Sequence, residues 1–198
     1  MGRGGRRHFT QSEANVLEAL ALLDESGGRH LPIMLMIESP IGVLRAEEIA
    51  AASERIACLV MATSDLLNQL HGRRTPDRTA LIHSLSHVLL AGRAYDRAVV
   101  DGISTDLKDM QSFEFACRLG RDLGFDGKSL VHPFQLPYSN DAFTPKPPDL
   151  AAALERIQGS IDELQDGQDH QQSGQHSQVC RHVQASVPRR DPASRLAT

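Results

Sequence analysis

The sequence lacks tryptophan, and its aromatic residues make up only 4% of 198 residues. This scarcity disfavours a binding surface built on aromatic stacking. No apolar run approaches the roughly 20 residues that a membrane-spanning helix needs, so we expect no membrane partner. The formal net charge is −4. It gives no electrostatic support for a nucleic-acid partner, which would need a basic face to neutralise phosphates, so we expect no such partner.

Cysteine is scarce as well. Cys58, Cys117 and Cys180 are odd in number and far apart, and no CxxC pair occurs. This spacing disfavours a disulfide framework or a zinc site and favours reduced thiols. We therefore expect a soluble protein with a cytoplasmic location.

The distribution of apolar residues suggests three regions. Residues 1–10, which contain several glycines and arginines, are expected to form a flexible basic leader. Residues 11–165 hold most of the apolar residues and are expected to form one domain. Residues 166–198 are rich in Gln, His and Ser. They cannot bury enough apolar surface to become ordered, so we expect a disordered tail.

Short apolar runs alternate with helical patterns along the expected domain. Strands are predicted at 31–37, 56–61, 98–102 and 129–131, and helices at 11–25, 43–55, 63–70, 77–95, 110–123 and about 148–164. The first run shows no alternation, which is typical of a strand buried on both faces. This order predicts an α/β fold with a parallel sheet. Four units are half of a (β/α)8 barrel, although an open doubly wound sheet fits the same order.

Two carboxylates follow consecutive predicted strands. Glu38 comes directly after the first apolar run, and Asp65 follows the second. Their side chains are expected to project into one opening, because parallel strands end at the same edge of a sheet. Hard oxygen ligands with open water positions suit Mg²⁺. Simpler roles are also possible for each residue: Glu38 at a solvent-exposed strand end or as a helix cap, and Asp65 as a helix cap.

Two further strand-end residues are weaker candidates. Asp101 ends the third predicted strand and is a possible third acidic group, but a turn role beside Gly102 fits better. His132 closes the fourth strand, and a lone histidine at such a position is more often structural than catalytic.

Two apparent motifs fail their requirements. His83 and His87 are four positions apart on a predicted helix, but neither an HExxH motif nor a third ligand accompanies them. The segment 127–129, Gly-Lys-Ser, looks like the end of a phosphate-binding loop. However, Asp122 stands where that motif needs glycine, and a strand follows where it needs a helix. For Lys128 a position near a ligand phosphate stays open, but the default expectation is a surface salt bridge.

Four blocks of this sequence, in order over about residues 13–160, resemble the HpcH/HpaI aldolase family, in its citrate lyase beta-subunit-like branch. Block 34–50 contains an apolar strand, Glu38-Ser-Pro, Gly-Val and Ala-Glu-Glu-Ile-Ala. Block 61–67 contains Thr-Ser-Asp65-Leu. Block 124–135 reads Gly-Phe-Asp-Gly-Lys-Ser-Leu-Val-His-Pro-Phe-Gln, and the fourth block is 140–145.

The resemblance implies a TIM-type (β/α)8 barrel and a Mg²⁺-dependent carbon–carbon lyase. The substrates would be 3-hydroxyacyl-CoA thioesters such as citryl-, malyl- or citramalyl-CoA, cleaved by retro-Claisen or aldol chemistry. Glu38 and Asp65 would be the protein ligands of Mg²⁺, and the protein would be a homo-oligomer. Catalytic and substrate-binding residues are not assigned.

The resemblance begins just before the family's fifth strand. We therefore expect a chain truncated to about four strand–helix units, without the acidic motif and the substrate-binding arginine of the first four strands. An alternative is a non-catalytic truncated paralogue that acts as an oligomerisation or interaction module. A free hydroxy-keto-acid aldolase is disfavoured by the Gly-Lys and His-Pro-x-Gln blocks.

Overall fold

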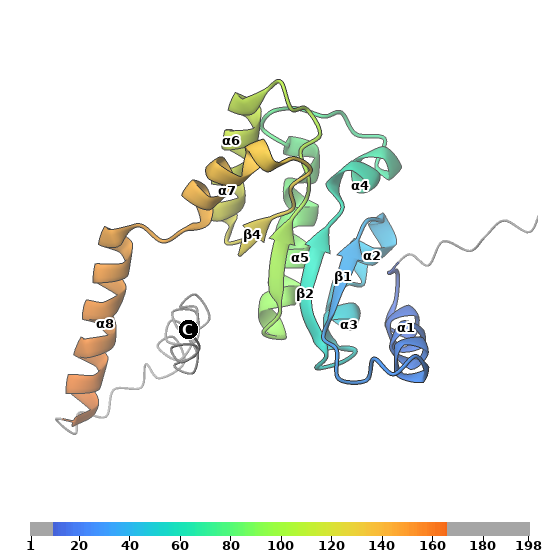
Figure 1. Cartoon of the computed structure of the whole chain (residues 1–198), viewed down its shortest axis with the longest axis horizontal. Coiled ribbons are helices and arrows are strands. Elements are labelled where there is room, and N and C mark those ends of the chain that lie inside the picture. The colour runs from blue at the N-terminus through green and yellow to red at the C-terminus, as the bar shows by residue number, and fades with distance from the viewer. Residues whose placement is uncertain (1–9, 166–198) are drawn as a thin grey trace, which may run out of the picture. The chain divides into compact units, whose positions relative to one another are not determined.

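A computed structural model describes residues 10–165 of the chain, which divides into two compact units at the boundary between Thr144 and Pro145 (Figure 1). The first unit contains a parallel sheet and the helices that cover it. The described part of the second unit is a single helix, α8 (Pro147–Gln165). The predicted tail, and the predicted leader except for residue 10, lie outside the described residues.

The sheet has four strands in the order β1-β2-β3-β4, and all neighbouring strands are parallel. The strands are β1 (Ile33–Ile37), β2 (Ile56–Met61), β3 (Ala98–Asp101) and β4 (Gly127–Lys128). The helices of the first unit are α1 (Glu13–Glu25), α2 (Pro40–Leu44), α3 (Ala46–Ala51), α4 (Thr63–Gln69), α5 (Ile82–Ala94), α6 (Met110–Leu123) and α7 (Leu136–Phe143), with 3₁₀ turns η1 (Thr79–Leu81) and η2 (Pro133–Gln135). This element order confirms the predicted α/β fold with a parallel sheet. Among residues 10–165, β1 and β4 are its outer strands.

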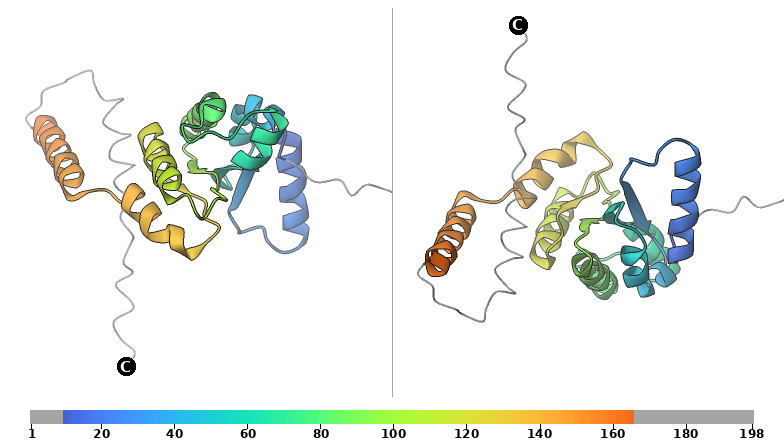
Figure 2. Two further views of the ribbon diagram at one scale, coloured as in Figure 1. Left: turned by 90° about the horizontal axis from the view of Figure 1, so that it is seen from above. Right: turned by 90° about the horizontal axis from the view of Figure 1, so that it is seen from below.

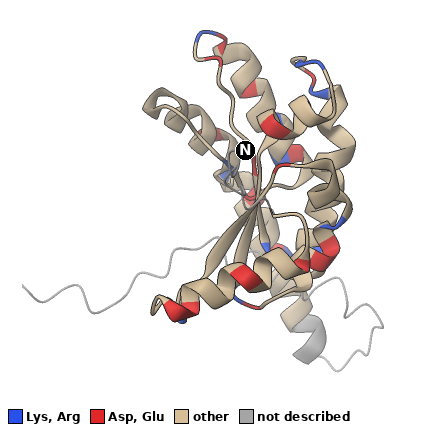
Figure 3. Cartoon of the chain, turned by 90° about the vertical axis from the view of Figure 1, so that its right-hand side faces the viewer, with Lys and Arg blue, Asp and Glu red and all other residues tan. Residues whose placement is uncertain are grey.

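The core lies between the helices and one face of the sheet. Successive strand residues point to opposite faces, and the residues that point toward the helices are buried: Leu35, Ile37, Leu59, Met61 and Val99. They belong to one apolar cluster with Ile49 of α3 and with Leu85 and Val88 of α5. The end-on views in Figure 2 show α5, in green, on one side of the strands. Charged residues occur mainly on helices and loops (Figure 3).

The other face of β1 is open within the described residues. Met34 is 63% exposed and Met36 is 50% exposed. The prediction that both faces of this strand are buried is therefore wrong for residues 10–165. The apolar run correctly indicated a strand, but the pattern of one strand does not identify which elements cover its two faces.

The predicted helix at 43–55 is two short helices. Ser39 caps α2, since its hydroxyl accepts a hydrogen bond from the Gly42 amide at 3.1 Å. Arg45 leaves helical geometry, with φ −106° and ψ 19°, and α3 begins after it. The predicted long helix also begins later than expected, at Ile82, because Arg78 adopts a left-handed backbone conformation with φ 56°.

The C-terminal part of the first unit departs most from the prediction. The fourth strand is β4 at Gly127–Lys128, just before the predicted position, and residues 129–131 are not a strand. Helix α7 was not predicted, although Pro137 in its first turn is a common helix-start signal. By contrast, β2 and α6 have the predicted bounds.

Cys58 and Cys117 are buried and form no disulfide among the described residues. Burial raises the pKa of each thiol to about 11, with a further contribution from the charge of Asp126 at Cys58. Cys180 lies outside the described residues. No helix within residues 10–165 is long and apolar enough to cross a membrane.

We expect Gly102→Ala to destabilise the chain by about 1–3 kcal/mol, because it overpacks a close approach of two strand ends. A Cβ atom at position 102 would lie 2.6 Å from the Met61 carbonyl oxygen and would also meet the Thr63 side chain. Urea denaturation followed by circular dichroism measures the loss.

Gly127→Ala is the matched control, because a Cβ atom at position 127 has nothing within 4 Å. Its stability should change by less than about 0.5 kcal/mol. Equal stability of the two variants would contradict the close packing of Gly102.

Candidate functional site

The carboxyl ends of the parallel strands form one edge of the sheet, and this edge carries both predicted metal ligands. Glu38 directly follows β1, and Asp65 lies in the first turn of α4, shortly after β2. Ile37 and Met61, the last residues of the two strands, are register partners. The chain therefore leaves β1 and β2 at the same level, and both carboxylates belong to the same edge.

Helix α4 turns one side toward the end of β1. The Gln69 side-chain amide donates a hydrogen bond to the Glu38 backbone carbonyl at 3.0 Å. Asp65 lies four residues before Gln69, and residues at this spacing share a helix face. Asp65 is therefore on the side of α4 that faces the end of β1.

The structure does not support helix capping as the role of either carboxylate. Ser39, not Glu38, caps α2, and α4 begins after Ala62 without a side-chain cap. Glu38 is half-buried, whereas Asp65 is exposed and forms no hydrogen bond or ion pair with the described residues. Capping is thus disfavoured, and Asp65 is available to an external ligand.

No group of three or more His, Cys, Asp or Glu side chains suited to a metal occurs among residues 10–165. A cation at Glu38 and Asp65 would therefore take two carboxylates from this part of the chain. Mg²⁺ suits such a site, since it usually retains several waters and binds through one or two carboxylates. The donor chemistry of the pair therefore fits Mg²⁺.

Asp101, at the end of β3, is fully buried and saturated with donors. Both terminal nitrogens of Arg78 bind its carboxylate, at 2.7 and 2.6 Å, and the Lys128 ammonium binds it at 2.9 Å. The Gly102 amide donates to it at 2.7 Å. The predicted local role beside Gly102 is present, but the two ion pairs dominate. The expectation of a surface salt bridge for Lys128 is wrong, because its side chain is only 1% exposed.

The strand register explains why Lys128 meets Asp101. The two residues are partners in the β3–β4 ladder, so their side chains lie next to each other on the same face. Asp101 is two residues from Val99, which points into the helix-covered core, so Asp101 points the same way. The Asp101–Arg78–Lys128 cluster, called the ion triad below, is thus buried on the helix-covered face.

Burial by itself would raise the pKa of Asp101, but the hydrogen bonds and charges of Arg78 and Lys128 outweigh it. The pKa of this carboxyl therefore lies below its usual value. Burial and the neighbouring Arg78 lower the pKa of Lys128, against the attraction of Asp101. Asp101 is ionised at neutral pH and is fully occupied, so it is not an available metal ligand.

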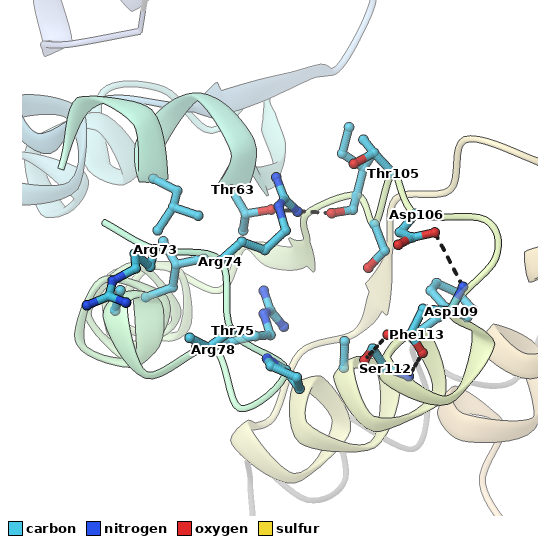
Figure 4. Close-up of a pocket in the computed structure, with 17 residues that line it drawn as sticks. Thr63, Arg73, Arg74, Thr75, Arg78, Thr105, Asp106, Asp109, Ser112 and Phe113 are labelled. Carbon is cyan, nitrogen blue, oxygen red and sulfur yellow. Dashed lines mark hydrogen bonds between the residues drawn. The ribbon is translucent and has the colours of Figure 1, made fainter. Parts of the chain in front are cut away.

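A cleft of about 230 Å³ opens above the ion triad, between the segment that follows α4 and the start of α6 (Figure 4). Arg73 and Arg74 lie on one wall, and Asp106 and Asp109 lie on the opposite wall. Arg78 also lines the cleft, so the ion triad has one member at the cleft surface. The walls also include apolar side chains, among them Leu67, Ile103 and Phe113.

The cleft and the Glu38–Asp65 pair lie on opposite sides of α4. Thr63 and Leu67, four residues apart, both line the cleft. Asp65 is two residues from Thr63, which is a rotation of about 200° around a helix. One side of α4 therefore faces the cleft, and the other faces the end of β1.

The three histidine candidates, His132, His83 and His87, make local contacts that suit structural roles. The His132 ring nitrogen Nδ1 accepts a hydrogen bond from the Phe134 amide at 3.2 Å, so His132 caps the short turn η2. The rings of His83 and His87 are stacked with centroids 6.2 Å apart. No third metal-binding side chain joins them among the described residues.

Comparison with known proteins identifies the class to which this arrangement belongs. The HpcH/HpaI aldolase/citrate lyase family matches residues 10–133. A (3S)-malyl-CoA thioesterase of Cereibacter sphaeroides is 42% identical over 146 residues, which cover 74% of this chain and 50% of that protein. The citrate lyase subunit beta of Haemophilus influenzae is 28% identical, over 80% of this chain and 56% of that protein.

Solved structures agree with this class. The protein CitE from Mycobacterium tuberculosis, in complex with magnesium, acetoacetate and coenzyme A, is similar with a TM-score of 0.61 and 28% identity. The similarity covers 77% of this chain and 55% of that chain. The chain therefore belongs to the HpcH/HpaI aldolase/citrate lyase family. It spans about half the length of the curated relatives it matches.

We expect Asp101→Asn to destabilise the chain by about 3–5 kcal/mol, because it leaves two buried cations without their carboxylate. Since the folded pKa of Asp101 is depressed, its stabilisation is present above the unfolded pKa of about 3.9 and is lost as the pH falls through the folded pKa. Urea denaturation at several pH values below 5 should show a weaker acid dependence in the variant.

Asp122→Asn is the matched control. Asp122 is exposed on α6 and forms no bond with the described residues. The free energy of unfolding of this variant should therefore differ from that of the unaltered chain by less than about 0.5 kcal/mol. An Asp101→Asn variant as stable as this control would contradict the role assigned to the ion triad.

Proposed function

We propose that the chain binds Mg²⁺ through Glu38 and Asp65 and acts on a 3-hydroxyacyl-CoA thioester such as malyl-, citryl- or citramalyl-CoA. The observation that carries the proposal is the placement of two non-capping carboxylates at the ends of paired parallel strands in a member of this family. The magnesium and coenzyme A of the similar solved structure support the same ligand chemistry.

The reaction we propose is carbon–carbon cleavage. A base removes the proton of the 3-hydroxyl group, the resulting alkoxide becomes a carbonyl, and the bond between C2 and C3 breaks. The electron pair goes to an acyl-CoA enolate, which takes up a proton at C2. A bound Mg²⁺ would supply Lewis-acid stabilisation of oxygen charge and a template for the substrate. Glu38 and Asp65 would hold the cation at the sheet edge, and the base is not assigned to a residue.

The four strand–helix units would be part of a (β/α)8 barrel, in which catalytic groups occupy the carboxyl ends of the strands. A homo-oligomer is part of the proposal. Two buried free thiols suit a reducing compartment such as the cytoplasm.

Thioester hydrolysis is a second candidate, because the 42%-identical relative is a (3S)-malyl-CoA thioesterase. In that reaction water attacks the thioester carbonyl, and the carbon–sulfur bond breaks to release CoA and a free hydroxy acid. The same carboxylate pair would serve both reactions, so the products separate the two candidates.

The metal site is tested by thermal unfolding of the full 198-residue chain with and without Mg²⁺ after chelator treatment. At a Mg²⁺ concentration about 100-fold above Kd, we expect the Tm to rise by about 5 °C or more, because the cation binds only the folded state. Glu38→Gln with Asp65→Asn should abolish the rise, because it removes both anionic ligands.

Glu18→Gln with Asp122→Asn removes two exposed carboxylates elsewhere and should keep the full Mg²⁺ response. No Mg²⁺ effect on the unaltered chain would contradict the proposed site and favour a non-catalytic interaction module. An equal loss in both double variants would indicate nonspecific cation binding.

The reaction is tested by incubating the chain with malyl-CoA and Mg²⁺ and identifying the products by mass spectrometry. Carbon–carbon cleavage yields acetyl-CoA and glyoxylate, whereas hydrolysis yields malate and CoA. We expect the cleavage products, and we expect the Glu38→Gln, Asp65→Asn variant to lose at least 100-fold in rate, about 2.7 kcal/mol of barrier. If malate and free CoA are the products, the lyase proposal is wrong and thioester hydrolysis is the supported reaction.

A further inference from the structure

We propose that the cleft between the segment after α4 and the start of α6 binds a small oxyanion-bearing organic ligand, through a phosphate or carboxylate group. The cleft is lined by Arg73, Arg74 and Arg78 and is distinct from the Glu38–Asp65 pair. The proposal does not depend on the Mg²⁺ site, because α4 separates the two regions.

The ion triad gives the first reason for an anion. It contains two cationic groups and one carboxylate, so the triad carries an excess of one positive charge. The side chains of Asp101, Lys128 and Arg78 are 0%, 1% and 10% exposed, respectively. An uncompensated charge in such a buried position is unfavourable. A bound anion would compensate it at the cleft, where Arg78 reaches the surface.

The walls of the cleft give the second reason. Arg74 lines the cleft (Figure 4), and its guanidinium is held in place because it donates to the Ser64 hydroxyl at 3.1 Å. Arg73 lies next to it on the same wall and forms no bond with the described residues. Arginine side chains in this arrangement offer planar donors that suit carboxylate and phosphate oxygens.

The acidic residues of the cleft are already occupied by local bonds. The Asp106 carboxylate accepts the Lys108 amide at 2.9 Å, and the Asp109 carboxylate caps α6 through the Ser112 amide at 3.0 Å. Both carboxylates are exposed, so solvent and salt screen their charge more than that of the buried triad. They lie on the wall opposite Arg73 and Arg74, so the oxyanion of the ligand would lie on the arginine side of the cleft.

The size of the cleft limits the ligand. Its volume of about 230 Å³ compares with roughly 30 Å³ for each water molecule in the liquid. This volume suits a short dicarboxylate or a diphosphate group. The apolar side chains of Leu67, Ile103 and Phe113 would contact the carbon part of such a ligand.

The test measures binding of two probes, succinate and inorganic pyrophosphate, to the full 198-residue chain by isothermal titration calorimetry. The buffer contains a chelator, no Mg²⁺ and constant ionic strength. We expect saturable binding of at least one probe, and the tighter probe identifies the source of the anion as carboxylate or phosphate. Arg74→Gln should weaken binding about tenfold, since it removes a charge-assisted contact.

Two control variants show whether the anion binds in this cleft. Arg29→Gln removes an exposed charge on another loop and should leave affinity within about twofold of the unaltered chain. Glu38→Gln with Asp65→Asn should also retain binding. Absence of saturable binding, an equal loss with Arg29→Gln, or loss of binding in the Glu38–Asp65 variant would each overturn the proposal.

Discussion

The ion pairs of the buried Asp101 carboxylate hold together the elements at the carboxyl ends of the strands. This carboxylate joins β3 to β4 through Lys128 and to the segment after α4 through Arg78. The backbone of Arg78 adopts a left-handed conformation, which costs free energy for a residue with a Cβ atom. The bidentate ion pair stabilises it and so determines where α5 begins. One charged group thereby positions two strands and one wall of the cleft.

Helix α4 divides this edge into two regions with different chemistry. On one side, Gln69 contacts the end of β1 near Glu38 and Asp65. On the other, Thr63 and Leu67 line the arginine-containing cleft. The short helix α4 thus separates two carboxylates from several guanidinium groups. The carboxylates suit a hard cation, and the guanidinium groups suit an oxyanion. The two regions carry side chains of opposite charge, and neither Glu38 nor Asp65 is among the residues that line the cleft.

The sequence was informative where structure depends on neighbouring residues. The bounds of β2 and α6 were predicted because an apolar run and a helical repeat are local patterns. The position of β4 was not predicted, because its register is set by β3 and by the ion pair of Lys128 with Asp101, 27 residues away. Lys128 looked like a surface residue for the same reason. Arg78 carried no local signal, since its partner lies on another element.

Asp65 and Asp101 show why a strand-end position alone does not identify a ligand site. Asp101 is the last residue of β3 and Asp65 comes shortly after β2, so both lie at the same edge of the sheet. Asp101 is fully buried, and four donor atoms occupy its carboxylate. Asp65 is exposed and has no partner among the described residues. A carboxylate that is already paired with two cations would lose those pairs on binding a metal. The availability of Asp65 and the saturation of Asp101 therefore favour a cation near β1 and β2 over one at β3.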